Sequence, residues 1–230
     1  MLDDPPSGGT SAPQLAANYL RKEILAGRFP AGMRLKTEEV AVTLGISRMP
    51  VRDALRQLHS EGLVVVRPNR GALVTRLTAK EVLEAFEIRA VLEGLAARCS
   101  CEGLTPHVLR QIEAVLRQMD QSKDDLEHWI ELHERFHEVL LAPAERPRLQ
   151  LQIRNARHAV LPYVRMYISV YHQVEMPSAE HEILLTIARR RNPDLLEAAM
   201  RDHILSAGHS VADFLQRPNP QPRSPAEKTT

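Results

Sequence analysis

The sequence predicts a mainly α-helical protein with two domains: a small N-terminal domain of helices and a β-hairpin, and a C-terminal all-α bundle of six helices. Its 230 residues exceed the length of one typical domain. Hydrophobic residues make up 43% of the chain, which suffices for a buried core, and aromatic residues only 4%, so the packing must depend on aliphatic side chains. From Thr78 onward every segment has the pattern of a helix. We therefore expect domains at 13–77 and 78–216, with disordered tails at 1–12 and 217–230.

The N-terminal domain is expected to contain three helices followed by a hairpin. The first helix is amphipathic and ends near Gly27. The second begins at Thr37 as its N-cap and is broken by Gly45. Ser47 caps the third helix, and Pro50 lies in its first turn, where a missing N–H costs little. The expected strands are 63–66 and 72–75, joined by a turn at 68–71.

The C-terminal domain is expected to be an all-α bundle because its helices are joined by short connections. Pro106, Pro143, Pro177 and Pro193 mark four of these connections. The expected helices are 79–101, 105–121, 124–141, 146–172, 176–191 and 193–216.

Cysteine use, the first residues and hydropathy exclude several classes of protein. Two cysteines cannot form a disulfide framework, and residues 1–10 do not resemble a signal peptide. Their spacing places Cys99 and Cys101 on different sides of a helix, which does not suit a metal pair. No apolar run reaches the roughly 18 residues needed to span a bilayer. We expect a cytoplasmic protein without a membrane partner.

The formal net charge of +1 conceals an asymmetry between the two halves. Residues 12–77 carry eleven Lys and Arg against five Asp and Glu, a net charge of +6. Residues 78–230 carry nineteen against twenty-two, a net charge of −3. A basic segment before an acidic one indicates nucleic-acid contact by the basic segment.

The second and third expected helices form a helix-turn-helix, with the third in the position of a recognition helix. Arg48 lies at the start of that helix and Arg52 follows one turn later, where arginines can bind guanine in the major groove. Ser47 and the helix N-terminus can bind a phosphate. Arg70 and Gly71 lie at the hairpin tip, where glycine lets the backbone approach DNA. The alternative for each arginine is a solvated face of an ordinary helical domain.

Residues 13–77 resemble the winged helix-turn-helix domain of GntR-family transcription regulators. The residues that carry this resemblance are Gly27, Pro30, Gly32, Leu35, Leu44-Gly45, Ser47-Arg48, Pro50-Val51-Arg52, Ala54-Leu55, Leu58, Glu61-Gly62-Leu63 and Arg70-Gly71. The resemblance implies that Ser47, Arg48, Arg52 and the wing around Arg70 and Gly71 contact double-stranded DNA. One departure is Thr37, where many relatives have Glu.

Histidines gather in the second half of the chain. His133 and His137 lie four residues apart, so they share a helix face and can both bind a metal ion. His181 and His203 lie on two later helices, and bundles often build metal sites from facing helices. Glu134 is expected to be solvated. The alternative is that these histidines are ordinary core or surface residues.

Residues 79–215 resemble the ligand-binding domain called FCD, in its six-helix, VanR-like type, through the segments 87–93, 132–137, 180–184 and 194–204. In that family an Asp and three His bind a divalent metal, which holds a small carboxylate effector. Carried over by position, His137, His181 and His203 are the three His, and the Asp is replaced by His133. Arg89 resembles the effector-facing arginine, and its alternative is a surface ion pair with Glu93.

Four neutral imidazoles would leave the charge of the metal uncompensated until an anion binds, and they favour zinc or nickel over calcium or magnesium. We therefore expect a homodimeric, metabolite-responsive repressor that is not an enzyme and that binds a near-palindromic DNA operator. Two alternatives stay open: a metalloenzyme using the histidine cluster, and a DNA-binding dimer whose bundle is a metal-free scaffold.

Overall fold

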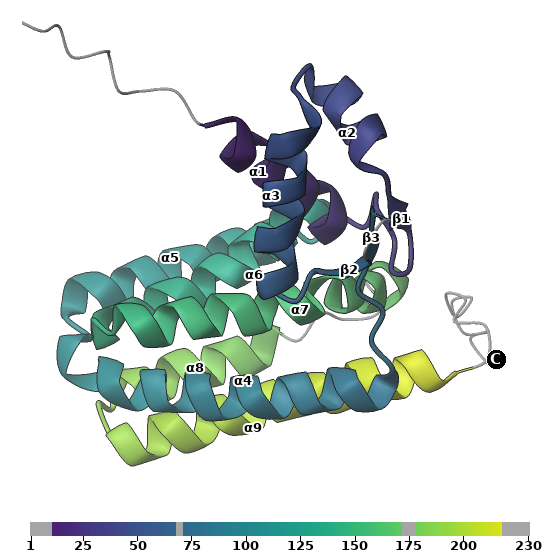
Figure 1. Ribbon diagram of the computed structural model, residues 1–230. Coiled ribbons are helices and arrows are strands. Elements are labelled where there is room, and N and C mark those ends of the chain that lie inside the picture. The colour runs from purple at the N-terminus through teal and green to yellow at the C-terminus, as the bar shows by residue number, and fades with distance from the viewer. Residues whose placement is uncertain (1–10, 68–70, 172–177, 218–230) are drawn as a thin grey trace, which may run out of the picture. The chain divides into compact units, whose positions relative to one another are not determined.

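A computed structural model describes residues 11–67, 71–171 and 178–217 of the chain. The chain divides into two compact units, Met1–Arg76 and Leu77–Thr230, which are described separately (Figure 1). The described residues form nine α-helices and one small antiparallel sheet, which confirms the predicted fold class. The predicted tails lie outside the described residues except for Ser11, Ala12 and Arg217.

The first unit combines three helices with a three-stranded sheet. Its elements are α1 (Ala12–Leu25), β1 (Arg34–Leu35), α2 (Thr37–Leu44), α3 (Arg48–Ser60), β2 (Val64–Arg67) and β3 (Gly71–Val74). The strand order is β1-β3-β2, so β3 lies in the centre. The prediction of a two-stranded hairpin was therefore incomplete. The sequence does not reveal β1, because a strand of two residues is too short to show an alternating pattern.

Local interactions explain the ends of the helices in this unit. Gly45 ends α2 in the left-handed conformation with φ 64°, as glycine does at many helix C-termini. The N-cap of α2 is Lys36, not Thr37, whose backbone is already helical. Ser47 is the N-cap of α3, as predicted, but its side chain makes no capping hydrogen bond. The Ser47 hydroxyl is therefore available to another partner.

The core of the first unit lies between its helices and one face of the sheet. Val51, Leu55 and Leu58 are buried along α3, on the face predicted to point inward. They pack with Leu20 of α1 and Val74 of β3 in one apolar cluster. The opposite face of α3 is exposed.

The second unit contains six α-helices within its described residues, as predicted. They are α4 (Ala79–Ser100), α5 (Pro106–Gln121), α6 (Leu126–Leu141), α7 (Pro147–Tyr171), α8 (Ser178–Arg189) and α9 (Pro193–Gln216). Thr78 and Glu81 form a capping box that fixes the start of α4. Pro106 and Pro193 occupy the first turns of α5 and α9, where proline is well tolerated.

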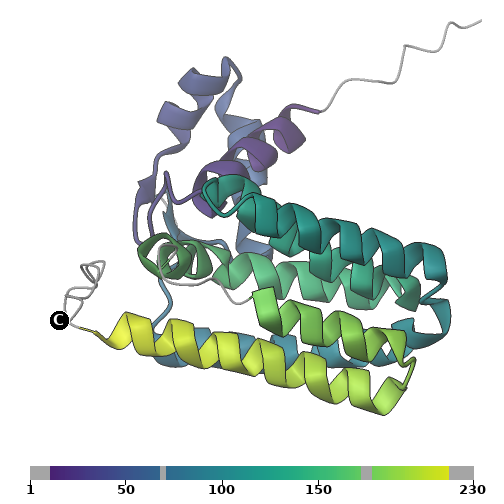
Figure 2. The same ribbon diagram turned by 180° about the vertical axis from the view of Figure 1, so that it is seen from behind.

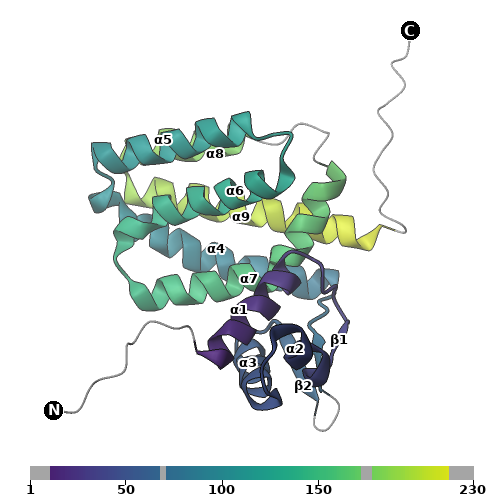
Figure 3. The ribbon, with the colours of Figure 1, turned by 90° about the horizontal axis from the view of Figure 1, so that it is seen from above.

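The six helices form two layers, with α5, α6 and α7 over α8, α9 and α4 (Figures 1 and 3). Helices α4 and α9 lie side by side along most of their length (Figure 2). Gly208 of α9 permits this close packing, because a Cβ there would lie 2.6 Å from Cβ of Phe86. Among the described residues, no helix has both the length and the hydropathy of a membrane span.

Candidate metal centre and nucleic-acid interface

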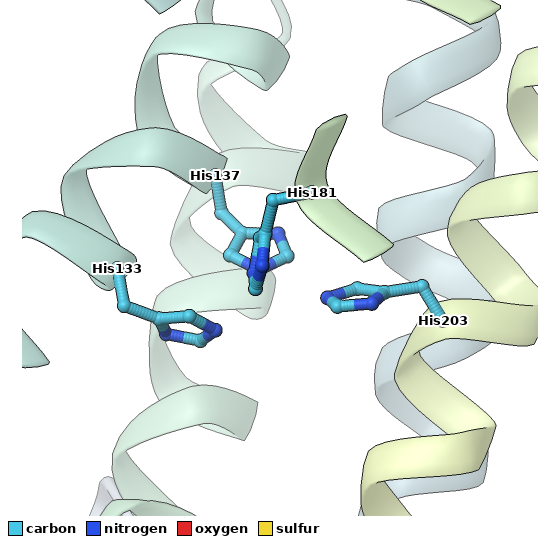
Figure 4. A group of neighbouring side chains, drawn as sticks. All are labelled: His133, His137, His181 and His203. Carbon is cyan, nitrogen blue, oxygen red and sulfur yellow. The ribbon is translucent and has the colours of Figure 1, made fainter. Parts of the chain in front are cut away.

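Four histidines from three helices converge between the two layers of the bundle. His133 and His137 come from α6, His181 from α8 and His203 from α9, and their side chains point toward one another (Figure 4). One ring nitrogen from each lies within 4.8 Å of the others. In a tetrahedral zinc site with Zn–N bonds of about 2.1 Å, two ligand nitrogens lie about 3.4 Å apart. Small side-chain movements would thus bring all four nitrogens to one ion.

The environment of the cluster keeps its imidazoles ready to bind a cation. Burial lowers the pKa of His133 well below its ordinary value, and the neighbouring His181 and His203 lower it further. Burial and His133 likewise lower the pKa of His137. Both rings are therefore neutral at pH 7, and each carries a free lone pair on one nitrogen.

His137 is the clearest sign that the cluster contains buried polar atoms without hydrogen-bond partners. Its side chain is 2% exposed, and neither ring nitrogen has a hydrogen-bond partner among the described residues. The nearest carboxylate oxygen, Oε2 of Glu93, lies 3.7 Å from Nδ1, which is beyond hydrogen-bond range. A buried polar atom without a partner is costly, and a bound ion would remove that cost.

Glu180 orients one of the four rings. Nδ1–H of His203 donates to Oε2 of Glu180 over 3.0 Å, which leaves Nε2 of His203 for another partner. The hydrogen bond from His203 lowers the pKa of Glu180. A carboxylate behind a histidine is a common arrangement around metal ions, because it fixes the ring and raises its basicity. The donor set and its surroundings therefore fit a borderline divalent ion such as zinc or nickel.

Arg89 forms an ion pair with Glu93, but the pair is buried rather than exposed as the alternative interpretation had it. Nε of Arg89 donates to Glu93 over 3.0 Å, and two nitrogens of Arg157 donate to the same carboxylate over 3.1 and 2.5 Å. Burial opposes the charge of Glu93, but Arg157 and Arg89 outweigh it and lower its pKa to about 2. Arg89 also packs on the ring of Phe86 and lines the cavity beside the histidines. Arg89 thus forms an ion pair with Glu93 and also lines the cavity, so each of the two interpretations describes part of its environment.

Glu134 was expected to be solvated, and that expectation was wrong. It is half-buried, and burial raises the pKa of its carboxyl. Arg157 and Arg89 lie close enough to oppose this rise in pKa, a tertiary proximity that the position of Glu134 on its own helix does not reveal.

The four histidines line a cavity of about 160 Å³. Helices α4, α6, α7, α8 and α9 contribute to its wall. Glu180 is the one carboxylate among the described residues that line it, and it already binds His203. The cavity can therefore receive an anion without facing an unpaired negative charge.

In the first unit, basic side chains gather around the exposed face of α3. They line one depression and comprise Arg34, Lys36, Arg48, Arg52, Arg56 and Arg67. Ser47, Arg48 and Arg52 are exposed at the start of the helix, as the helix-turn-helix interpretation requires. Glu38 of α2 forms an ion pair with Arg48 over 3.2 Å. Such a surface can follow a phosphate backbone and present arginines to base edges.

Gly71 begins β3, where the sheet itself restricts the residue type; its predicted contact with DNA stays a prediction. Its φ is +80°, and a Cβ at this position would lie 2.7 Å from the carbonyl oxygen of Leu35 in β1. Glycine is therefore required by the sheet itself, whether or not DNA approaches. Arg70, the other residue predicted at the hairpin tip, lies outside the described residues.

Sequence comparisons identify both parts of the chain. The sequence model described as bacterial regulatory proteins, gntR family, matches residues 14–74, and that of the FCD domain matches residues 84–206. The chain belongs to the GntR family. It is therefore a DNA-binding transcription regulator with an FCD domain.

Relatives of this GntR-family regulator match along most of their length. The HTH-type transcriptional repressor RspR of Escherichia coli K12 is 30% identical over 201 residues, covering 86% of this chain and 87% of RspR. A probable D-xylose utilization operon transcriptional repressor of Paenarthrobacter nicotinovorans is 26% identical, covering 85% and 86% of the two chains. The solved structure of E. coli McbR/YncC has the same fold, with a TM-score of 0.77 at 22% identity over 89% and 98% of the two chains.

Sequence reasoning missed part of the basic face of the regulator. Arg56 could have been found, because it follows Arg52 by one helical turn on the same exposed side. Arg34 could not, because it reaches this face through β1, whose pairing with Leu73 of β3 is a tertiary contact. Within the bundle, the structure brings the predicted residues together, since all four histidines and Arg89 line one cavity.

Proposed function

We propose that this GntR-family regulator is a repressor whose DNA binding responds to a small carboxylate, held by a divalent metal ion and Arg89. The observation that carries the proposal is the pair of buried ring nitrogens of His137, which lack partners in the centre of a cluster of neutral imidazoles. The names of RspR and the D-xylose relative support repression as the direction of control.

His133, His137, His181 and His203 would hold the metal, and Glu180 would orient His203. Zinc or nickel suits four nitrogen donors better than calcium or magnesium, which prefer oxygen ligands. When bound, the ion would supply a positive charge that attracts and orients an anion. Four neutral ligands do not compensate this charge, so a carboxylate at the site is favoured.

Arg89 would contribute the second contact to the carboxylate. Among the described residues, its hydrogen bond to Glu93 uses Nε, which leaves the two terminal nitrogens of the guanidinium for a ligand. The Glu93 carboxylate is shared between two arginines, so the buried group as a whole carries one net positive charge. An anion entering the cavity therefore meets a compensating charge.

Residues 13–77 would bind the operator through Ser47, Arg48, Arg52 and the wing around Arg70 and Gly71. Each protomer of a homodimer would read one half of a near-palindromic site. A stripe of exposed apolar side chains on α4, Ile88, Val91 and Leu95, supports dimerisation through the helical domain of 78–216. Effector binding would shift the equilibrium between two arrangements of the DNA-binding domains. This shift can be no larger than the difference between the free energies with which the effector binds the two arrangements.

Metal content tests the proposal most directly. In the double variant His137→Ala and His203→Ala, zinc and nickel uptake should be lost, because two of four ligands are gone. DNA binding without metal should be retained, since the basic face belongs to the other unit. The matched control is His128→Ala, an exposed histidine of the same helix, which should bind metal as the unaltered chain does.

Elemental analysis after exposure to each metal provides the measurement. Unchanged metal content in the double variant would refute the ligand set. If the unaltered chain takes up neither zinc nor nickel, the helical domain is a scaffold, and the metal-dependent part of the proposal fails. A thermal-shift screen of carboxylic acids with and without metal then tests the effector, because a ligand of the native state raises its melting temperature.

A further inference from the structure

Trp129 is a second residue of the cavity with a buried polar atom that lacks a hydrogen-bond partner among the described residues. It lies on α6, is 2% exposed, and lines the cavity one helical turn before His133. Its indole Nε1 is buried and has no hydrogen-bond partner among the described residues. The indole N–H only donates, so the partner it lacks is an acceptor. Neither the proposed metal nor Arg89 can supply one.

The part of the cavity around Trp129 is mainly apolar. Val164 and Ile168 of α7 and Val211 of α9 line it together with Trp129. The cavity wall also contains three residues with hydroxyl groups, Tyr167, Ser206 and Ser210. Val211 follows His203 by two helical turns, and Trp129 precedes His133 by one, so this apolar part extends away from the histidines along both helices. The cavity therefore has a polar end, formed by the neutral histidines and the charged Arg89, and a mainly apolar end in which the Trp129 indole N–H lacks a partner among the described residues.

The volume limits the size of what the cavity can hold. It measures about 160 Å³. An apolar cavity of about 150 Å³ in another protein holds a single benzene molecule. Because this volume includes the end with the histidines and Arg89, the apolar body of a ligand is no larger than about one six-membered ring.

We propose that the effector is a monocarboxylic acid with a compact apolar body, about the size of a benzene ring, and an acceptor atom that receives a hydrogen bond from Nε1–H of Trp129. This inference rests on the proposed function and adds the chemical class of the effector. Sugar acids and tricarboxylic acids are disfavoured, because most of their hydroxyl and carboxylate groups would face apolar side chains such as Val164, Ile168 and Val211. Trp129 is then a specificity-determining residue of the cavity.

The single tryptophan of the chain makes the site observable in the unaltered protein. The zinc-loaded full-length chain is titrated with benzoate, meta- and para-hydroxybenzoate, the corresponding methylbenzoates, citrate and gluconate, and Trp129 fluorescence reports occupation. Benzoates should bind at least about tenfold more tightly than citrate or gluconate. In a nitrogen-labelled sample, the single indole N–H resonance should move further downfield with a hydroxybenzoate than with its methyl counterpart.

Tighter binding of citrate or gluconate, with release of DNA, would overturn this inference and leave the proposed function standing. Binding of none of these acids would also overturn this inference, whereas the proposed function fails only if no acid in the thermal-shift screen binds. Equal indole shifts for the hydroxy and methyl acids would overturn the role of Trp129.

Trp129→Phe removes the N–H and keeps an aromatic ring. Measured by calorimetry, the preference for hydroxybenzoate over methylbenzoate should fall by about five- to tenfold, the worth of one hydrogen bond. The control is Ile130→Val, a conservative change at a buried neighbour on α6 that does not line the cavity, which should keep the preference. An unchanged preference in a folded Trp129→Phe protein would refute the hydrogen bond.

Discussion

Glu93 lies at the centre of the buried charge network beside the histidines, and replacing it by glutamine tests what holds that network together. Glutamine has nearly the same shape but no charge. It would leave Arg89 and Arg157 buried side by side without the carboxylate to which both donate hydrogen bonds. We expect Glu93→Gln to destabilise the second unit strongly, because removing one partner of a buried ion pair leaves an uncompensated charge.

The structure sets the size of this effect. Arg157 and Arg89 lower the pKa of Glu93 from 4.5 to about 2 against the opposing effect of burial. One pKa unit corresponds to about 1.4 kcal/mol, so the charged form stabilises the folded state by about 3 kcal/mol relative to the neutral form. Breaking buried pairs typically costs about 3–5 kcal/mol, which agrees with this value. For a unit of this size the melting temperature should fall by about 10 °C.

Urea denaturation of the metal-free protein, followed by Trp129 fluorescence, measures this loss, because the tryptophan lies in the same unit as Glu93. Glu87→Gln, an exposed position on the same helix, is the matched control and should change stability by less than about 0.5 kcal/mol. Equal unfolding free energies for the two variants would refute the reasoning, since they would show that the ion pairs add nothing to stability.

Further expectations concern pH, packing and DNA. Because the pKa of Glu93 is lowered on folding, its contribution is complete above about pH 4.5, and the stability gap to Glu93→Gln should close as pH falls toward 2. Gly208→Ala should cost about 1–3 kcal/mol in urea denaturation because its Cβ would meet Phe86, whereas Gly94→Ala, whose Cβ meets a movable arginine side chain, should cost less. Arg52→Ala should weaken binding to an operator selected from random DNA by about 1–3 kcal/mol in fluorescence anisotropy; an equal loss on random DNA would show a phosphate contact only.

The sequence predicted the elements well where a local signal was strong. Apolar periodicity and proline punctuation predicted the bundle helices to within about two residues, because both depend on neighbouring residues alone. The strand β1 and the true N-cap of α2 were not predicted. The strand β1 depends on how Leu35 pairs with Ala72, which lies far along the chain.

For the candidate site, the sequence by itself determined which chemistry was available. The spacing of His133 and His137 placed two imidazoles on one helix face, and the resemblance to a known family added His181 and His203. Only the tertiary structure decided that all four meet, that Arg89 and Glu93 are buried together with Arg157, and that Trp129 keeps an unpartnered donor in the same cavity. Helix periodicity fixes the face on which a side chain lies, whereas burial, pKa and unmet hydrogen bonds depend on which other helix covers that face.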